Sequence, residues 1–295
     1  MAESLKVLRR RVRSVRNTRQ ITRAMEMVAA AKLRRAQQIL SAGRPYARKL
    51  QELLGHLAEG QSTAGNPLFE QREAKNILLV LFTSDRGLCG AFNNHLIRLA
   101  EEFLKSYSPD KVRLICVGKK GYDYFKKRRW EIVDQITNLG GSLKAEESNA
   151  LAEKLREVFL SRRADEIHIL YNSFISTVRY RPVRELFLPL RPEALLGQKQ
   201  TQVEVKKETL DYIFEPSPRR VFDLLLPRYL NSKIYITFAE EFAAEHSARM
   251  IAMNSATNNC EELMDQLTLR LNKARQSSIT RELLDIVGGA EALRD

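Results

Sequence analysis

The stretch from Ser14 to Gln37, SVRNTRQITRAMEMVAAAKLRRAQ, decides the fold of this chain. Its small and apolar side chains recur at alternating spacings of three and four residues, a pattern that places one stripe of a helix against a partner helix. The pattern extends outward from Ser4 to about Glu59, which predicts a helix about 80 Å long. Because isolated helices are marginally stable in water, such a helix needs a partner to cover its stripe. The stripe consists of Leu5, Leu8, Val12, Val15, Thr18, Thr22, Met25, Ala29, Leu33, Ala36, Leu40, Gly43, Ala47, Leu50, Leu54 and Leu57.

A second stripe of the same kind lies near the other end of the chain. Ser217 and Pro218 are typical of a helix N-cap followed by a first-turn proline, and Gly288 with Gly289 predicts where that helix ends. We therefore expect two long helices that pair antiparallel, with the middle of the chain forming a domain at one end of the pair. The second stripe consists of Met250, Met253, Thr257, Cys260, Met264, Leu267, Leu271 and Ala274.

Prolines fall inside both predicted helices. A proline within a helix loses a backbone hydrogen bond and clashes with the preceding turn. Gly43 and Pro45 therefore predict a kink or a break in the first helix, and Pro227 predicts a kink in the second.

The middle of the chain alternates between strand and helix patterns. Residues 76–82 (NILLVLF) predict a fully buried strand, and further strands are expected at 113–117 and 166–174. Helices are expected at 93–105, 121–127 and 146–160, so that the sheet is mostly parallel, while 172–188 indicates a turn into an antiparallel edge strand. The expected fold class is α/β, with a long antiparallel coiled coil of N- and C-terminal helices and a central Rossmann-like domain. The expected division is an N-terminal helix at 1–60, a linker at 61–75, the α/β domain at 76–188, a linker at 189–210 and a C-terminal helix at 211–295.

Positive charge is concentrated at the start of the chain. Residues 1–50 hold fourteen lysines and arginines against two acids, although the whole chain carries a net charge of +13. This pattern is compatible with a solvated helix face, with binding to nucleic acid, or with binding to an acidic protein surface. An Arg-rich start also resembles a mitochondrial transit peptide, but the apolar period continues unbroken for tens of residues and favours a structural helix.

Composition restricts the cellular setting. No apolar run approaches the roughly 20 residues needed to cross a bilayer, so we expect any membrane attachment to go through partner proteins. The three cysteines, Cys89, Cys116 and Cys260, are too scattered for a disulfide framework or a metal site and suggest a reducing compartment. The four histidines, His56, His95, His168 and His246, show no metal-binding spacing and are interpreted as structural.

The segment TSDRGLCGAFN, from Thr83 to Asn93, is the one place that could be mistaken for an active site. A phosphate-binding loop would carry a lysine and a Ser or Thr after Gly90, and a dinucleotide loop would need a third glycine; neither is present. A thiol nucleophile at Cys89 would need a histidine close to it in space. His95 is close only in sequence, a few residues further on and across a turn into a helix. We therefore expect a tight turn, and no catalytic residue, cofactor or metal.

Three segments closely resemble the gamma subunit of the rotary (F-type) ATP synthase. They are SVRNTRQITRAMEMVAAAKLRRAQ, TSDRGLCGAFN and the run ARMIAMNSATNNCEELMDQLTLRLNKARQSSITRELLDIVGGAEA at 248–292, and they fall in the family's order across nearly the whole chain. The resemblance implies a non-catalytic rotor in the central stalk, inside a ring of alpha and beta subunits and joined to the epsilon subunit and the membrane c-ring. It also implies peripheral attachment at the cytoplasmic face of the cell membrane. The cysteine-containing insertion of chloroplast members is missing, which favours the bacterial type.

The resemblance also implies contact residues. Family beta subunits present an acidic loop near the position of Met25, and this loop would pair electrostatically with the basic helix. The positions of Arg249, Arg275, Gln276 and Thr280 contact the surrounding ring, and the segment from Tyr212 to Glu215 matches the family's foot on the c-ring. By length, about a dozen residues of the second helix should project beyond the first. A stand-alone α/β enzyme and a basic nucleic-acid-binding coiled-coil protein are the alternatives.

Overall fold

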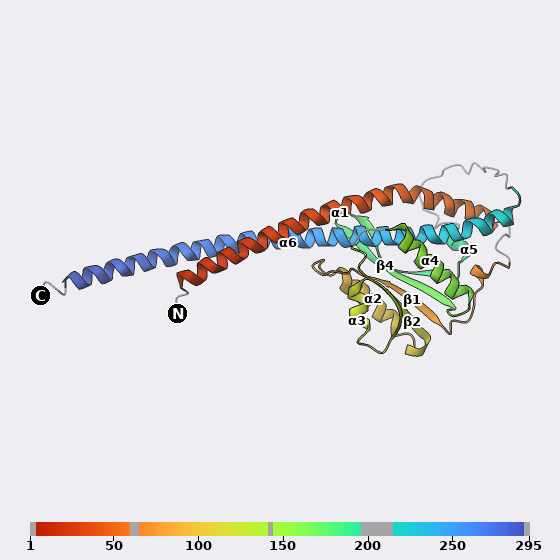
Figure 1. Cartoon of the computed structure of the whole chain (residues 1–295), viewed down its shortest axis with the longest axis horizontal. Coiled ribbons are helices and arrows are strands. Elements are labelled where there is room, and N and C mark those ends of the chain that lie inside the picture. The colour runs from red at the N-terminus through yellow and green to blue at the C-terminus, as the bar shows by residue number, and fades with distance from the viewer. Residues whose placement is uncertain (1–3, 60–64, 141–143, 196–214, 292–295) are drawn as a thin grey trace. The chain divides into compact units, whose positions relative to one another are not determined.

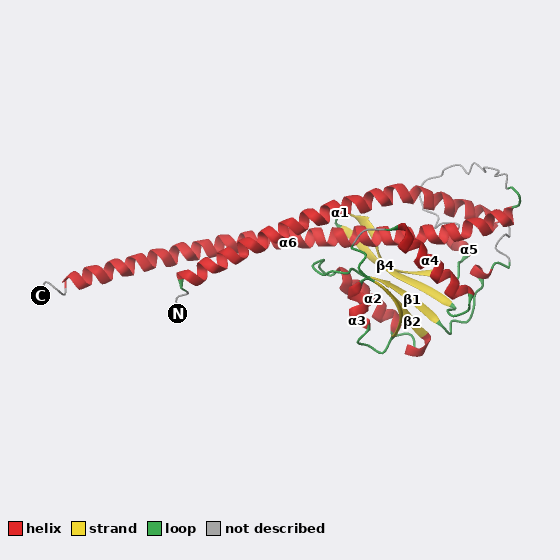
Figure 2. Ribbon diagram, viewed as in Figure 1, coloured by secondary structure: helices red, strands yellow, loops and turns green. Residues whose placement is uncertain are grey.

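A computed structural model describes residues 4–59, 65–140, 144–195 and 215–291 (Figure 1). Two helices dominate the chain: α1 (Leu5–Glu59) and α6 (Pro218–Glu291). A five-stranded sheet and the shorter helices lie between them in sequence (Figure 2). The chain forms two compact units, one of Met1–Ala29 with Arg249–Asp295 and one of Ala30–Ala248. The predicted fold class, paired terminal helices with a central α/β domain, is confirmed.

In the first unit, α1 and α6 pair antiparallel as expected. The hydroxyl oxygens of Thr22 and Thr257 lie 2.8 Å apart, and the Asn254 amide donates to Glu26 Oε1 at 3.1 Å. Lower numbers on α1 meet higher numbers on α6, since Arg19 Nη1 lies 3.4 Å from Glu261 Oε1. The predicted stripes supply the buried side chains of this pair, which include Leu8, Thr22, Ala29, Met253, Thr257 and Leu267.

The second unit is built on a sheet with the strand order β3-β2-β1-β4-β5. The first four strands of that order are parallel, and β5 joins the edge antiparallel to β4. All six residues of β1 are buried because this central strand is covered on both faces. The strands are β1 (Ile77–Phe82), β2 (Val112–Val117), β3 (Glu131–Ile136), β4 (Glu166–Ser176) and β5 (Arg179–Leu188).

Helices cover both faces of this sheet. On one face, α2 (Phe92–Leu104) and α3 (Lys119–Phe125) bury a core that includes Leu79, Leu81 and Leu114. On the other, α4 (Ala145–Leu160) lies over β1 and β2, and α6 brings Phe238 edge-on to Phe82 with ring centroids 4.9 Å apart. The short elements are η1 (Pro67–Phe69), η2 (Pro109–Lys111) and α5 (Pro192–Leu195).

Two neighbouring glutamates fasten α6 to the sheet. Glu240 accepts from Arg44 Nη2 of α1 at 2.8 Å and from Ser173 Oγ of β4 at 2.7 Å. Glu241 accepts from the backbone N–H of Asn172 at 2.6 Å. Hydrogen bonds to ionised groups are stronger than neutral ones, so the contacts of Glu240 hold α1, α6 and β4 in one arrangement by directional bonds as well as by apolar packing.

Of the kink or break predicted at Gly43 and Pro45, the break is wrong. Helix α1 continues through both residues, and Figure 1 shows it curving without interruption. Pro45 and Ser41, whose carbonyl loses its helical partner, are both exposed, so water can satisfy that carbonyl. Pro227 likewise lies inside the continuous helix α6.

Other boundaries also differ from the predictions. Helix α6 continues past Gly288 and Gly289 to Glu291, because glycine in a helix costs only about 1 kcal/mol unless it adopts a left-handed conformation. Strand β3 was not predicted, since its residues alternate between exposed and half-buried at the sheet edge. The linker predicted at 189–210 contains α5, and its remainder from residue 196 lies outside the described residues.

Glu241 predicts an unusual dependence of stability on pH. Burial raises its pKa well above the ordinary value, opposed by the Asn172 N–H and reinforced by the charge of Glu245. The folded chain therefore holds a proton that the unfolded chain releases, and stability falls as the pH rises from the unfolded pKa toward the folded one. We expect Glu241→Gln to flatten this fall, measured as melting temperature from pH 5 to pH 8. Glu102→Gln, on an exposed glutamate of α2, should leave the slope unchanged. An identical slope for Glu241→Gln and the wild type would contradict the prediction.

Candidate functional site: the exposed faces of the helix pair

The N-terminal half of α1 presents a cationic surface. Glu26 is the one acid among residues 4–29 of the described chain, and its carboxylate accepts from Asn254. Arg19 is paired with Glu261, but most of the other arginines point into solvent. This surface suits an acidic partner. The exposed arginines include Arg9, Arg10, Arg13, Arg16 and Arg23.

An apolar stripe lies beside the seam on the same helix. Ile21 and Val28 are 60% and 58% exposed, and Met25 lies half-buried between them at spacings of four and three residues. Met27 is exposed to the same degree as Ile21. Large apolar side chains aligned on an exposed helix face mark an interaction surface. Of these residues, only Met25 was predicted as a contact. Ile21 and Val28 could have been found from a second apolar row at helical spacing, offset from the seam.

The structure brings two of the predicted contact residues near each other. Met25 is about level with Asn254 of α6, since Asn254 bonds the neighbouring Glu26. Arg249 is half-buried and lies only about 8 Å further along the axis of α6.

The remaining predicted contact residues lie elsewhere. Arg275, Gln276 and Thr280 are exposed and lie about 30 to 40 Å from the level of Met25, nearer the C-terminus. Glu215 belongs to the second unit and is exposed just before α6, and Tyr212 lies outside the described residues.

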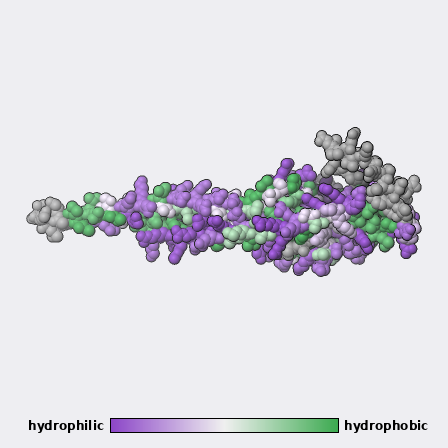
Figure 3. All heavy atoms as spheres, turned by 90° about the horizontal axis from the view of Figure 1, so that it is seen from above, coloured by the Kyte–Doolittle hydropathy of each residue, from purple (hydrophilic) through white to green (hydrophobic). Residues whose placement is uncertain are grey.

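The C-terminal end of α6 extends beyond the start of α1. The register of Thr22 against Thr257 places Leu5 about level with Arg275, so about sixteen residues, or about 24 Å, of α6 run on alone. This overhang is slightly longer than predicted. It also carries an apolar surface that the sequence analysis passed over, visible beside the grey C-terminal residues (Figure 3). Its exposed members are Ile279, Leu283, Leu284, Ile286 and Val287.

The loop from Thr83 to Asn93 connects β1 to α2 and is internally bonded. The Asn93 amide donates to Ser84 Oγ at 2.8 Å and to Cys89 Sγ at 3.3 Å, while Asn93 Oδ1 accepts from the Ser84 N–H. Asp85 accepts from the Lys119 N–H at the start of α3. Cys89 is 2% exposed. These contacts give the loop a structural explanation, as the interpretation of a tight turn anticipated.

A close backbone approach fixes the neighbouring turn. Gly118 has a φ of +95°, and a Cβ at this position would lie 1.9 Å from the Thr83 carbonyl oxygen. Only glycine fits there. Gly121 donates its N–H to Thr83 Oγ1 at 2.9 Å, so that the first turn of α3 is tied to the residue that follows β1.

No group of three His, Cys, Asp or Glu side chains in the described part of the chain is arranged to hold a metal ion. No helix within the described ranges combines the length and apolarity needed to span a bilayer.

Burial raises the pKa of Cys116 to about 12, and burial lowers the pKa of His168 despite its bond to Glu166.

These features define a class of protein in which two long terminal helices pair antiparallel and carry exposed cationic and apolar surfaces, with a mostly parallel α/β domain between them in sequence. A family model described as ATP synthase matches residues 4–293. ATP synthase gamma chains of Chloroherpeton thalassium and Syntrophobacter fumaroxidans are 42% and 45% identical to this chain. The alignments cover 98% of both chains in the first case and 99% of both in the second. The chain belongs to the ATP synthase gamma-chain family, and the matched relatives are bacterial.

Solved structures confirm the fold. A chain in the Euglena gracilis mitochondrial ATP synthase is 20% identical, with a TM-score of 0.66 and coverage of 98% of this chain and 94% of that one. A chain in the central stalk and c-ring structure of the Tetrahymena thermophila enzyme is 24% identical, with a TM-score of 0.60. The match covers 80% of this chain and 99% of the Tetrahymena thermophila chain.

The bonding of the Thr83 to Asn93 loop predicts different costs for two substitutions. Asn93→Ala removes the donor and acceptor that hold Ser84 and Cys89, and should lower the free energy of unfolding by about 1–3 kcal/mol. Cys89→Ser should cost less, because the serine oxygen still accepts from Asn93. Urea denaturation of the full chain measures both. A larger loss for Cys89→Ser than for Asn93→Ala would show that the sulfur, and not the amide, organises the loop.

Proposed function

We propose that this chain is the central-stalk rotor subunit of a bacterial ATP synthase, transmitting torque between a proton-driven membrane ring and the catalytic alpha and beta subunits. The observation that carries the proposal is the 42–45% identity to gamma chains over nearly the full length of both partners. The paired helices support it, because a rotor needs a stiff element with an exposed contact surface. The chain itself is non-catalytic in this proposal, and ATP chemistry belongs to the beta subunits.

The exposed surfaces of the helix pair fit the proposed partners. The arginines of α1 and the stripe of Ile21, Met25 and Val28 are suited to the acidic loop of the beta subunits. Arg249 would contact the ring at about the level of Met25. Arg275, Gln276 and Thr280 would contact the ring further along α6, with polar groups that form directional bonds.

The opposite end of α6 is assigned to the membrane side. The segment from Tyr212 to Glu215 would form the foot on the c-ring, with the epsilon subunit bound beside it. These contacts would hold the chain peripherally at the cytoplasmic face of the cell membrane. The supporting observation is that Glu215 is exposed immediately before α6 begins.

Purification from the native host tests the proposal directly. An affinity-tagged chain should recover alpha, beta and epsilon subunits and the c-ring in one ATPase complex, and the isolated chain should show no turnover. Recovery of an uncomplexed chain with its own ATPase activity would favour the enzyme alternative. Salt-sensitive DNA binding without ATPase subunits would favour the nucleic-acid alternative.

The contact between Thr22 and Thr257 offers a test of rotor rigidity. Thr22→Cys with Thr257→Cys should form a disulfide between α1 and α6, since the two hydroxyl oxygens lie 2.8 Å apart. Because both helices belong to one rotor, this cross-link should leave ATP-driven rotation of the reconstituted complex within about twofold of the reduced form. A disulfide from Met25→Cys to a beta subunit should stop rotation until it is reduced. Arrest by the internal cross-link would mean that the helices slide or unwind during turnover.

A second comparison separates the tip from the polar contacts below it. Deleting residues 288–295 should preserve assembly and most rotation, since Ile279 to Val287 remain to occupy the surrounding sleeve. Arg275→Ala with Gln276→Ala should impair coupling more, because it removes the charged and hydrogen-bonding side chains. Single-molecule rotation and ATP-driven proton pumping measure the two effects. Loss of torque in the truncation with a harmless double substitution would reverse the assignment.

A further inference from the structure

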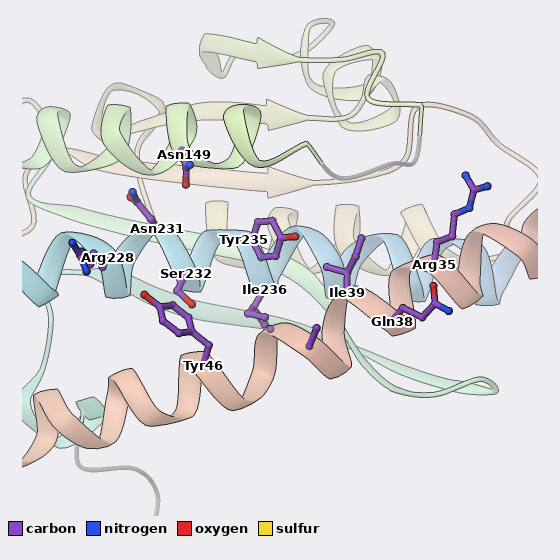
Figure 4. Close-up of a pocket in the computed structure, with 12 residues that line it drawn as sticks. Arg35, Gln38, Ile39, Tyr46, Asn149, Arg228, Asn231, Ser232, Tyr235 and Ile236 are labelled. Carbon is purple, nitrogen blue, oxygen red and sulfur yellow. The ribbon is translucent and has the colours of Figure 1, made fainter.

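A groove runs along the second unit between α1 and α6, with α4 at one margin (Figure 4). Its volume is about 850 Å³. In that view Tyr46 of α1 lies between the two ribbons beside Ser232 of α6, and Ile39 projects from α1 toward α6. Tyr235 lies at the edge of α6 that faces α4, from which Asn149 projects. Tyr46 is 56% exposed, so a large aromatic side chain is left uncovered in the groove.

The walls of the groove follow helical periodicity. Arg35, Ile39, Ala42 and Tyr46 form one stripe along α1, at spacings of four, three and four residues. On α6 the lining residues recur at the same kind of spacing, at Arg228, Asn231, Ser232, Tyr235 and Ile236. Two parallel rows of side chains at this period form the ridges and holes into which a third helix packs.

Small residues bring the two walls together at the bottom of the groove. A Cβ added to Gly43 would lie 2.9 Å from Ile236 Cδ1, so α1 and α6 are in close contact there. Ala42 beside it is exposed and leaves room for an approaching backbone. The middle of the groove is therefore shallow and mainly apolar, a shape that suits a helix better than a compact small molecule.

The two ends of the groove carry unmatched positive charge. Arg35 lies at one end and Arg228 at the other, and both are exposed. Among the described residues, no carboxylate lines the groove and neither arginine has an ion-pair partner. Arg44, by contrast, is already bonded to Glu240. The unpaired charge at both ends points to an occupant with negative charge at matching positions.

The register gives the length of that occupant. Because Gly43 meets Ile236, Arg228 is about level with Gln51 of α1. The two arginines are then separated by about sixteen residues, or about 24 Å, along the groove. A helix of between four and five turns covers this distance.

We propose that this groove binds an α-helix of a partner protein, one that carries an apolar stripe along its length and a carboxylate near each end. The apolar stripe packs on Ile39, Tyr46 and Tyr235, and the carboxylates pair with Arg35 and Arg228. The inference goes beyond the rotor function and holds for the second unit alone.

Designed peptides test the proposal on the isolated full-length chain. The probe is an 18-residue fluorescein-labelled amphipathic helix with leucine and alanine on one face and a glutamate pair near each end. Its charge-reversed twin has lysine at the same places. Fluorescence anisotropy should show at least tenfold tighter binding of the acidic peptide. Arg35→Glu with Arg228→Glu should abolish that preference or reverse it.

A matched control separates the groove from general charge. Arg34→Glu with Arg220→Glu makes the same change of net charge on the same two helices, at exposed arginines that do not line the groove. It should keep the affinity for the acidic peptide within about threefold. Ala42→Trp, which fills the apolar middle without altering charge, should weaken binding at least tenfold, with circular dichroism confirming that the variant is folded. Equal losses in the groove and control variants, or absence of binding to the wild type, would overturn the proposal.

Photo-crosslinking in cells then identifies the occupant. A benzoylphenylalanine at position 46, in place of Tyr46, should capture a defined segment whose sequence, identified by mass spectrometry, is acidic and has apolar residues at helical spacing. Capture of a second copy of this chain, or of a basic or extended segment, would overturn the proposal. Because the peptide experiment uses the isolated chain, its outcome is independent of whether the chain assembles into an ATP synthase.

Discussion

The packing of α1 on α6 is the interaction on which the rest of the structure depends. Neither helix can cover its own apolar stripe, and the two stripes come from opposite ends of the chain. Burying Leu8, Leu33 or Leu54 therefore requires α6, near the end of the chain, to run back along α1. The α/β domain is the part of the chain that connects the two helices. Its mostly parallel sheet must be covered on both faces, and α4 and α6 cover the face opposite α2 and α3.

Polar contacts then set how α6 sits on the sheet. Apolar packing alone would permit several rotations of a helix over a sheet. The carboxyl groups of Glu240 and Glu241 restrict the choice, because each accepts a hydrogen bond from a specific residue of β4. Burying Glu241 with one oxygen unpaired costs stability, and the gain is a single defined arrangement.

Much of the fold could be predicted from the sequence, because long periodic stripes and buried apolar runs are local signals. The stripe through Thr22 and the run at Ile77–Phe82 needed no tertiary information. Strand β3 could not be recognised, since EIVDQI becomes a strand only by pairing with β2 at an edge. Pro45 does not break α1 and Gly288 does not end α6, because their effect depends on whether the surroundings supply water or a left-handed turn.

The candidate contact surface was predictable only in part. Met25 was identified by resemblance, but the exposure of Ile21 and Val28 depends on which side of α1 faces α6. Periodicity places a residue in a stripe without saying whether that stripe is covered. The groove near Tyr46 was not recognised for a related reason, since it requires the stripes of two helices and the position of α4.

The pairing of the two chain ends also has a consequence for biosynthesis. The stripe of α1 leaves the ribosome first, whereas Met253 and Thr257, which cover part of it, are about 200 residues behind. At bacterial translation rates this delay lasts roughly 10 to 40 s, during which the α/β domain can fold but the N-terminal stripe has no partner. The run of arginines on that helix keeps the nascent segment hydrated and self-repelling through the interval. The same charges that offer a surface to a partner in the folded protein thus protect the newborn chain from aggregation.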